Sequence, residues 1–185
     1  MAGLSEQSIR DSLQRYIDGD RDAFVEFYHA TRQACYFYIR AQLGAGGRDA
    51  ADEVLQNFYL KIVRHPGPFL DARNLAAYVY ATLRRDVAEH GMAERRMDHA
   101  SLQDVPDLAL ADRPPRPSRE EDFLGWLRQL PAVQREVITL KLNGDVTLQE
   151  VSRLTGQPLQ TVAAQYRRGL EAVREHWRRW NQGEK

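Results

Sequence analysis

The chain has 185 residues, and its 26 basic and 26 acidic side chains give a formal net charge of zero. Hydrophobic residues make up 43% and charged residues 28%, the balance of an ordinary globular protein with one domain or two small ones. A neutral chain is a poor candidate for simple DNA coating, which needs a large basic excess. Neutrality is compatible with a protein that shares DNA with a partner, because the partner can supply phosphate contacts.

Three features indicate a cytoplasmic protein that does not insert into a membrane. No apolar run approaches the roughly 20 residues needed to span a bilayer. The first ten residues lack the charged start and apolar stretch of a signal peptide. Cys35 is the single cysteine and cannot form an internal disulfide, and its apolar surroundings favour a small core residue.

The N-terminal half predicts helices, because apolar residues recur there at steps of three and four. We expect two helices over 5–43 with a break near 18–20, then an amphipathic helix over 48–64. The sequence Pro66-Gly67-Pro68 ends that helix, and a further helix follows from Asn74 to about Arg96.

The segment 97–118 differs from its neighbours in composition. It contains four prolines and four aspartates and has few residues to bury, so we predict a flexible linker.

Helical periodicity resumes at Arg119. One apolar segment ends at Pro131 and a second runs over 133–142. Thr147 and Glu150 then have the spacing of a capping box, which predicts a short helix that ends at Gly156. Pro158 opens the long final helix, in which the missing proline N–H costs nothing at the first position.

The stretch from Thr147 to Arg174 has the pattern of a helix-turn-helix. In that motif the first helix supports the second, which lies in the major groove of DNA. We expect the groove side to carry Gln160, Thr161, Ala164, Gln165 and Arg168, with Arg167, Arg168 and Arg174 near phosphates. The core side should carry Leu159, Val162, Tyr166, Leu170 and Val173. Taken alone, the stretch is equally compatible with a plain helical bundle.

The segment from Leu130 to Val137, followed by Thr147 to Arg174, resembles region four of the extracytoplasmic-function sigma factors of bacterial RNA polymerase. The phrases that carry this resemblance are Leu-Pro-Ala-Val-Gln-Arg-Glu over 130–136 and Pro-Leu-Gln-Thr-Val over 158–162. Two further phrases resemble region two of the same family: Ala-Asp-Glu-Val-Leu-Gln-Asn-Phe-Tyr-Leu over 51–60 and Ala-Tyr-Val-Tyr over 77–80. Asn57, Arg85, Ala163 and Ala164 depart from the usual family residues.

The resemblance implies an all-α fold of two small helical domains joined by a flexible linker. Region two would occupy 1–96, the linker 97–118 and region four 119–185. The expected function is to bind core RNA polymerase, recognise promoter DNA and initiate transcription, with an anti-sigma factor as a further partner.

The resemblance also assigns site residues. Asp52, Glu53 and Gln56 would bind polymerase, and the alternative is a solvated helix face. Arg84 and Arg85, with Arg95 and Arg96, would meet the minus-ten element, and the alternative is ordinary surface arginines. Phe69 would hold a flipped base, and the alternative is a core residue beneath its loop. Gln160, Thr161, Ala164, Gln165, Arg167 and Arg168 would contact the minus-thirty-five element.

The sequence gives no indication of enzyme activity. We find no glycine-rich phosphate loop, nucleophile motif or paired carboxylates, and the five histidines have no metal-ligand spacing, so we predict no enzyme activity, metal or cofactor. Two rival functions stay open: a stand-alone helix-turn-helix regulator, and a sigma-like decoy that binds an anti-sigma factor without reading DNA.

Overall fold

The computed structural model describes residues 6–43, 47–100, 119–143 and 146–183. Across these ranges all regular structure is helical and no strand is present, which confirms the predicted all-α fold. The N-terminal helices are α1 (Glu6–Ile17), α2 (Arg21–Leu43), α3 (Gly47–Arg64), α4 (Gly67–Asp71) and α5 (Leu75–Ala100). The C-terminal helices are α6 (Arg119–Gln129), α7 (Ala132–Asn143), α8 (Leu148–Thr155) and α9 (Leu159–Asn181).

Local chemistry explains where the N-terminal helices begin. Between α1 and α2, Gly19 has a φ of 107°, a conformation that residues with a Cβ rarely adopt. The Asp20 carboxylate then accepts a hydrogen bond from the Ala23 N–H at 3.3 Å and caps α2. The Asn74 side chain accepts from the Ala77 N–H at 2.7 Å and caps α5 in the same way.

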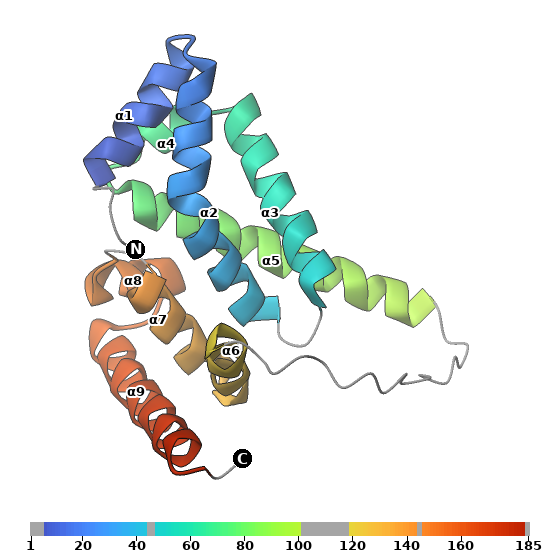
Figure 1. Cartoon of the computed structure of the whole chain (residues 1–185), viewed down its shortest axis with the longest axis vertical. Coiled ribbons are helices and arrows are strands. Elements are labelled where there is room, and N and C mark those ends of the chain that lie inside the picture. Colours follow the sequence, from blue (N-terminus) through green and yellow to red (C-terminus); the bar gives the residue numbers. More distant parts are fainter. Residues whose placement is uncertain (1–5, 44–46, 101–118, 144–145, 184–185) are drawn as a thin grey trace.

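The N-terminal half is a bundle in which α2 lies between α1 and α3, while α5 crosses behind it (Figure 1). A buried hydrogen bond of 2.8 Å joins the hydroxyls of Thr31 and Tyr59 within this bundle. Burying one large apolar side chain contributes about 1.5–3 kcal/mol, so the shared apolar face drives the packing. Its largest fully buried side chains are Leu13, Phe27, Tyr38, Ile39, Phe58, Ile62 and Leu83.

The C-terminal half is organised around α7, which packs against α6, α8 and α9. The α7–α9 contact is close at Gly169, where an added Cβ would lie 2.8 Å from Ile138 Cγ1. A side chain at this position would therefore push the two helices apart. The buried hydrophobic side chains of this half are Leu124, Leu127, Leu130, Val137, Ile138, Leu140, Val146, Val151 and Val162.

The two halves pack together along the C-terminal part of α2, where α6 and α7 lie (Figure 1). Val137 and Leu140 of α7 belong to the same buried cluster as the N-terminal core. At the α6 end, Ala41 of α2 is fully buried, and Phe37 stacks on Phe123 with ring centroids 5.9 Å apart. We call this shared boundary the seam.

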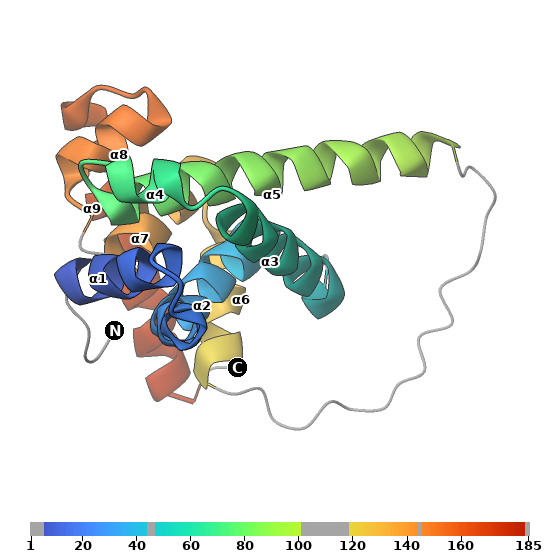
Figure 2. The same cartoon turned by 90° about the horizontal axis from the view of Figure 1, so that it is seen from above.

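The long helix α5 extends past the rest of the bundle (Figure 2). It continues to Ala100, into the segment predicted as linker. The remaining predicted linker, 101–118, lies outside the described residues. The division into 1–96, 97–118 and 119–185 stays a prediction.

One core prediction for the final helix is wrong. Leu159 was expected on the core side, but its side chain is 46% exposed. Pro158 is the N-cap of α9 rather than its first helical residue, with extended backbone angles of −56° and 140°. Leu159 therefore begins the helix, and the first residue that reaches the core is Val162, which is fully buried.

Candidate nucleic-acid and polymerase interfaces

Helices α8 and α9 form a helix-turn-helix whose turn is fixed by local hydrogen bonds. The predicted capping box is confirmed: the Thr147 hydroxyl accepts from the Glu150 N–H at 3.2 Å, and the Glu150 carboxylate accepts from the Thr147 N–H at 2.7 Å. Gly156 ends α8 with a φ of 70°, in the left-handed region that favours glycine. The Ser152 hydroxyl donates to the Gln157 carbonyl at 2.6 Å and holds the turn closed.

The outward side of α9 agrees with most of the predicted DNA face. Val162 and Gly169 are buried toward α7, which turns the opposite side of the helix to solvent. Gln165 and Ala164 are half-buried at the border of that side. The predicted DNA residues that are exposed are Gln160, Thr161, Arg167, Arg168 and Arg174.

Arg84 and Arg85 are neighbours on α5. In the sequence they are far from the residues of α9 that form the predicted DNA face. Both residues are exposed, and the Arg84 side chain retains 46% of its accessible surface. Arg84 Nε donates to the Glu136 carboxylate at 2.6 Å, and its Nη1 donates to the Leu154 carbonyl at 3.4 Å. Arg84 therefore contacts the C-terminal half across the seam. Arg95 and Arg96, also predicted to meet the minus-ten element, have side chains that lie outside the described residues.

Phe69 is a core residue in this structure. Its side chain is only 4% exposed, and its ring packs edge-on against Phe58 and Tyr78 at centroid distances of 6.0 and 4.9 Å. The bundle would have to rearrange around α4 before this ring could stack on a base. Phe69 is therefore not part of the exposed surface of this structure.

The predicted polymerase residues share one exposed face of α3. Asp52, Glu53 and Gln56 are all exposed, whereas Val54 and Leu55 between them are buried. Asp52 and Gln56 border a groove of about 290 Å³ between α2 and α3. The other residues lining the groove are Phe24, Tyr28, Arg32, Leu55, Tyr59, Leu60 and Val63, so an apolar floor adjoins the polar edge.

Three carboxylates of the C-terminal half were not predicted to have a role, yet each meets a donor of the N-terminal half. Glu136 accepts from Arg84, and Glu150 accepts from the Asn74 amide. Glu121 accepts from Arg40 at 3.0 Å and from Arg48 at 3.2 Å. The partners of these pairs are 52 to 81 residues apart in the chain.

The hydrogen bonds of Glu150 and Glu121 determine their protonation. Burial alone would raise the pKa of Glu150, but hydrogen bonds from Thr147 and Asn74 outweigh it and lower the pKa. Burial also opposes ionisation of Glu121, and the charges and hydrogen bonds of Arg40 and Arg48 lower its pKa. Both groups are therefore ionised at neutral pH.

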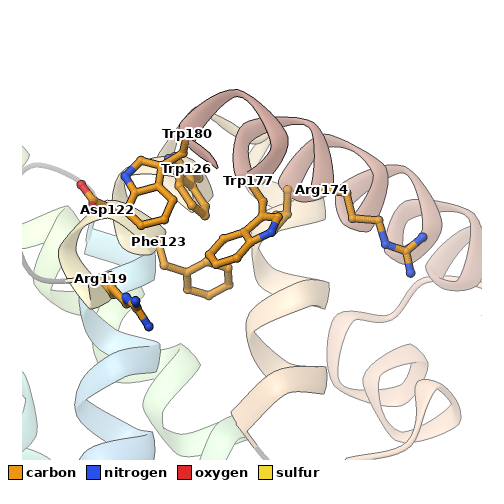
Figure 3. A pocket seen from close by; sticks show the side chains of 8 residues that line it. Arg119, Asp122, Phe123, Trp126, Arg174, Trp177 and Trp180 are labelled. Carbon is orange, nitrogen blue, oxygen red and sulfur yellow. The ribbon is translucent and has the colours of Figure 1, made fainter. Parts of the chain in front are cut away.

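An aromatic cluster joins the end of α9 to α6 (Figure 3). The ring of Trp126 packs edge-on against Trp177 and Trp180 with centroids 6.2 and 6.3 Å apart. These rings and Phe123 line an open hollow of about 380 Å³. Nothing in the local sequence indicates that Trp177 and Trp180 pack against Trp126.

Other chemistry is limited in the part of the chain that the structure describes. Burial raises the pKa of the Cys35 thiol to about 12, so the thiol is protonated at neutral pH and serves as a core residue. Within the described ranges no group of three or more His, Cys, Asp or Glu side chains could hold a metal ion. No described helix combines the length and apolar character needed to cross a membrane.

Fold and surfaces together define a helical protein with a helix-turn-helix and a separate grooved helix face. Residues 121–173 match the family model described as "Sigma-70, region 4". The ECF RNA polymerase sigma factor SigK of Mycobacterium tuberculosis H37Rv is 29% identical, and the match covers 89% of this chain and 91% of that protein. SigD of Mycobacterium bovis, also an ECF RNA polymerase sigma factor, is 25% identical over 86% of this chain and 79% of its own length.

Two solved structures share the fold. The sigma factor RpoE of Bartonella quintana, in complex with the anti-sigma factor NepR, has a TM-score of 0.65 and 19% identity over 85% of this chain and 98% of its own. CnrH, in complex with the cytosolic domain of CnrY, has a TM-score of 0.61 and 14% identity over 91% of this chain and 96% of its own. The chain is similar to extracytoplasmic-function sigma factors over most of its length, and this is the family that the sequence resembled.

Proposed function

We infer that this protein is a sigma factor: it binds core RNA polymerase, recognises promoter DNA and initiates transcription. The observation that carries the inference is a helix-turn-helix with an exposed polar and basic face, in a chain related to ECF sigma factors over 89% of its length. As in that family, the polymerase would perform the chemistry, and this chain would supply DNA recognition. An anti-sigma factor is a further proposed partner, because both structural neighbours are complexes, one of them with a named anti-sigma factor.

The proposed promoter contacts fall on two separate helices. On α9, Gln160, Gln165 and Arg168 would read base edges of the minus-thirty-five element, since glutamine can pair bidentately with adenine and arginine with guanine. Arg167 would bind phosphate. On α5, Arg84 and Arg85 would meet the minus-ten element through phosphate or guanine contacts.

The proposed polymerase contact is the α3 face. Asp52 and Glu53 present carboxylates to solvent, and Gln56 adds an amide beside the apolar groove. A partner helix with basic side chains and apolar residues on one face would complement both features.

Co-elution with core RNA polymerase tests the α3 face. Glu53→Lys combined with Gln56→Ala should weaken binding without a change in helix content, because both residues are exposed. Arg21→Ala on exposed α2 surface, outside the groove, is the control and should bind as the original chain does. If all three proteins co-elute equally with core RNA polymerase, the α3 face is not the main docking site.

Binding of the full chain to a library of duplexes at fixed salt tests α9. Gln165→Ala should relax preference at one base pair, which corresponds to roughly 1–3 kcal/mol of discrimination. Arg167→Ala should weaken every sequence alike. If Gln165→Ala leaves base preference unchanged at every position, the proposed placement of α9 in the groove is wrong.

A further inference from the structure

The hollow between α6 and the end of α9 has walls of aromatic rings (Figure 3). Phe123 and Trp126 come from α6, and Trp177 and Trp180 come from α9. Its volume of about 380 Å³ lies within the range of about 300–1,000 Å³ that is usual for pockets holding small organic molecules. Three indoles and a benzyl ring around one opening suit a guest that is itself apolar and flat.

The indole rings leave flat apolar surface in contact with solvent. Trp177 is 45% exposed, although its ring stacks on that of Trp180 with centroids 5.4 Å apart and planes inclined at 27°. The Trp126 ring stands edge-on to both, at 79° and 68°. A planar aromatic guest can therefore stack on one indole face and meet another ring edge-on, which are the two favoured geometries of aromatic pairs.

Charged side chains at the rim of the hollow select the kind of guest. Arg119 and Arg174 line it together with one carboxylate, that of Asp122, so positive charge is in excess. In the described part of the chain, neither guanidinium forms an ion pair with a carboxylate. Aromatic cages also bind organic cations, but the excess of arginine disfavours a cation here. A carboxylate matches the planar donor fork of arginine.

The hollow is separate from the residues proposed to read DNA. Gln160, Gln165 and Arg168 lie near the start of α9, whereas the rings lie at its end. Arg174, which the sequence placed near phosphates, also lines the hollow. Its side chain is directed away from the rings, whereas Arg119 lies beside Phe123 (Figure 3). Arg119 is therefore the better placed of the two arginines to hold an anionic group.

We propose that this hollow binds a planar aromatic carboxylate, whose ring packs among Trp126, Trp177 and Trp180 and whose carboxylate accepts hydrogen bonds from Arg119. The site goes beyond the proposed function, which requires no small ligand. Its occupant would join α6 to α9 and leave the start of α9 exposed. The ligand would therefore be an effector of the C-terminal half and not a competitor for base contacts.

The indole N–H signals of an isotope-labelled chain measure occupancy directly. The chain contains three tryptophans, and all three line the hollow. Titration of the full chain with 2-naphthoate should shift the three signals along one saturable curve, with a Kd of about 1 mM or below for a ligand of this size. The uncharged isostere 2-naphthamide should bind about tenfold more weakly, because it forms no charge-assisted pair.

Three variants separate the arginine contact from the ring contact. Arg119→Gln should weaken binding of 2-naphthoate about tenfold and leave binding of 2-naphthamide unchanged. Arg178→Gln removes the same charge from exposed α9 surface outside the hollow and should change neither. Trp177→Leu should weaken both ligands by the same factor, because it removes a ring and no charge.

Three results would overturn the proposal. If 2-naphthoate produces no saturable shift of the indole signals, the hollow is not a ligand site. If the acid and the amide bind equally, or if Arg119→Gln binds 2-naphthoate as tightly as the original chain, the rim does not select a carboxylate. If protonated 2-naphthylmethylamine binds more tightly than 2-naphthoate, the rings form a site for cations.

Discussion

The ion pair between Arg40 and Glu121 should be the most costly single polar contact to remove from the seam. The Arg40 side chain is only 9% exposed and donates twice to Glu121, at 3.0 and 3.2 Å. Exposed pairs contribute about 0.2–1 kcal/mol, whereas breaking a buried pair costs about 3–5 kcal/mol. Glu121 is 27% exposed, so this pair lies between the two limits, and we expect Glu121→Ala to cost about 2 kcal/mol.

The loss of stability in Glu121→Ala has an upper limit, because α6 can separate from α2 once the Glu121 carboxylate is deleted. Separation would rehydrate Arg40 but would also expose the stacked rings of Phe37 and Phe123. For a chain of this size, about 2 kcal/mol lowers the thermal midpoint by roughly 4–8 °C. A midpoint within about 1 °C of the original chain would refute the reasoning that a buried guanidinium depends on Glu121.

Thermal unfolding followed by circular dichroism provides the assay, and the neighbouring residue provides its control. Glu120 is exposed and lies on the same turn of α6, so Glu120→Ala should change stability by less than about 0.5 kcal/mol. Arg48, which is 71% exposed, is the weaker donor to Glu121. Arg48→Ala should therefore cost about 0.2–1 kcal/mol, as an exposed pair does.

Three more predictions follow from the contacts of the C-terminal half and the seam. Thr147→Ala removes the cap of α8 and should cost about 0.5–2 kcal/mol in urea unfolding; an unchanged midpoint would contradict the role of the capping box. Gly169→Ala should destabilise the chain by about 1 kcal/mol, because the clash with Ile138 (about 1–3 kcal/mol) exceeds the helix-propensity gain of about 1 kcal/mol. A stabilised Gly169→Ala chain would mean that α9 can move away from α7 at little cost. Acid should weaken the contact between the halves: Arg40 and Arg48 lower the pKa of Glu121 across the seam, so this stabilisation is present above the ordinary value of 4.5 and is lost as pH falls below it. A thermal midpoint that falls on acidification as much in Glu121→Gln as in the original chain would contradict that assignment.

Most of the helices could be predicted because their signals are local. Apolar spacing, the break near 18–20 and the Thr147 capping box each act within a few residues. The sequence predicted Pro158 as the first helical residue of α9, but Pro158 is the N-cap. Proline fits both the N-cap and the first helical turn, so its presence does not separate the two positions. Leu159, which periodicity alone had assigned to the core, lies exposed at the first position of α9.

The seam could not be predicted, because nothing local marks it. Its pairs join residues 52 to 81 positions apart, and glutamates such as Glu136 have the same local pattern as any solvated helix residue. Phe69 shows a related limit: the sequence predicted a loop where the structure has helix α4, and an aromatic residue in such a loop fits both a base-binding and a core interpretation. Only packing against Phe58 and Tyr78 separates the two.

Run-off transcription with purified core polymerase tests the central claim most directly. The template is the promoter region upstream of the protein's own operon, and the reactions contain core polymerase alone, this protein alone, or both. The account predicts a discrete transcript only when both are present, and less of it with Glu53→Lys and Gln56→Ala in α3. A protein that binds this duplex tightly by itself but yields no transcript with core polymerase would contradict the account and favour a stand-alone regulator.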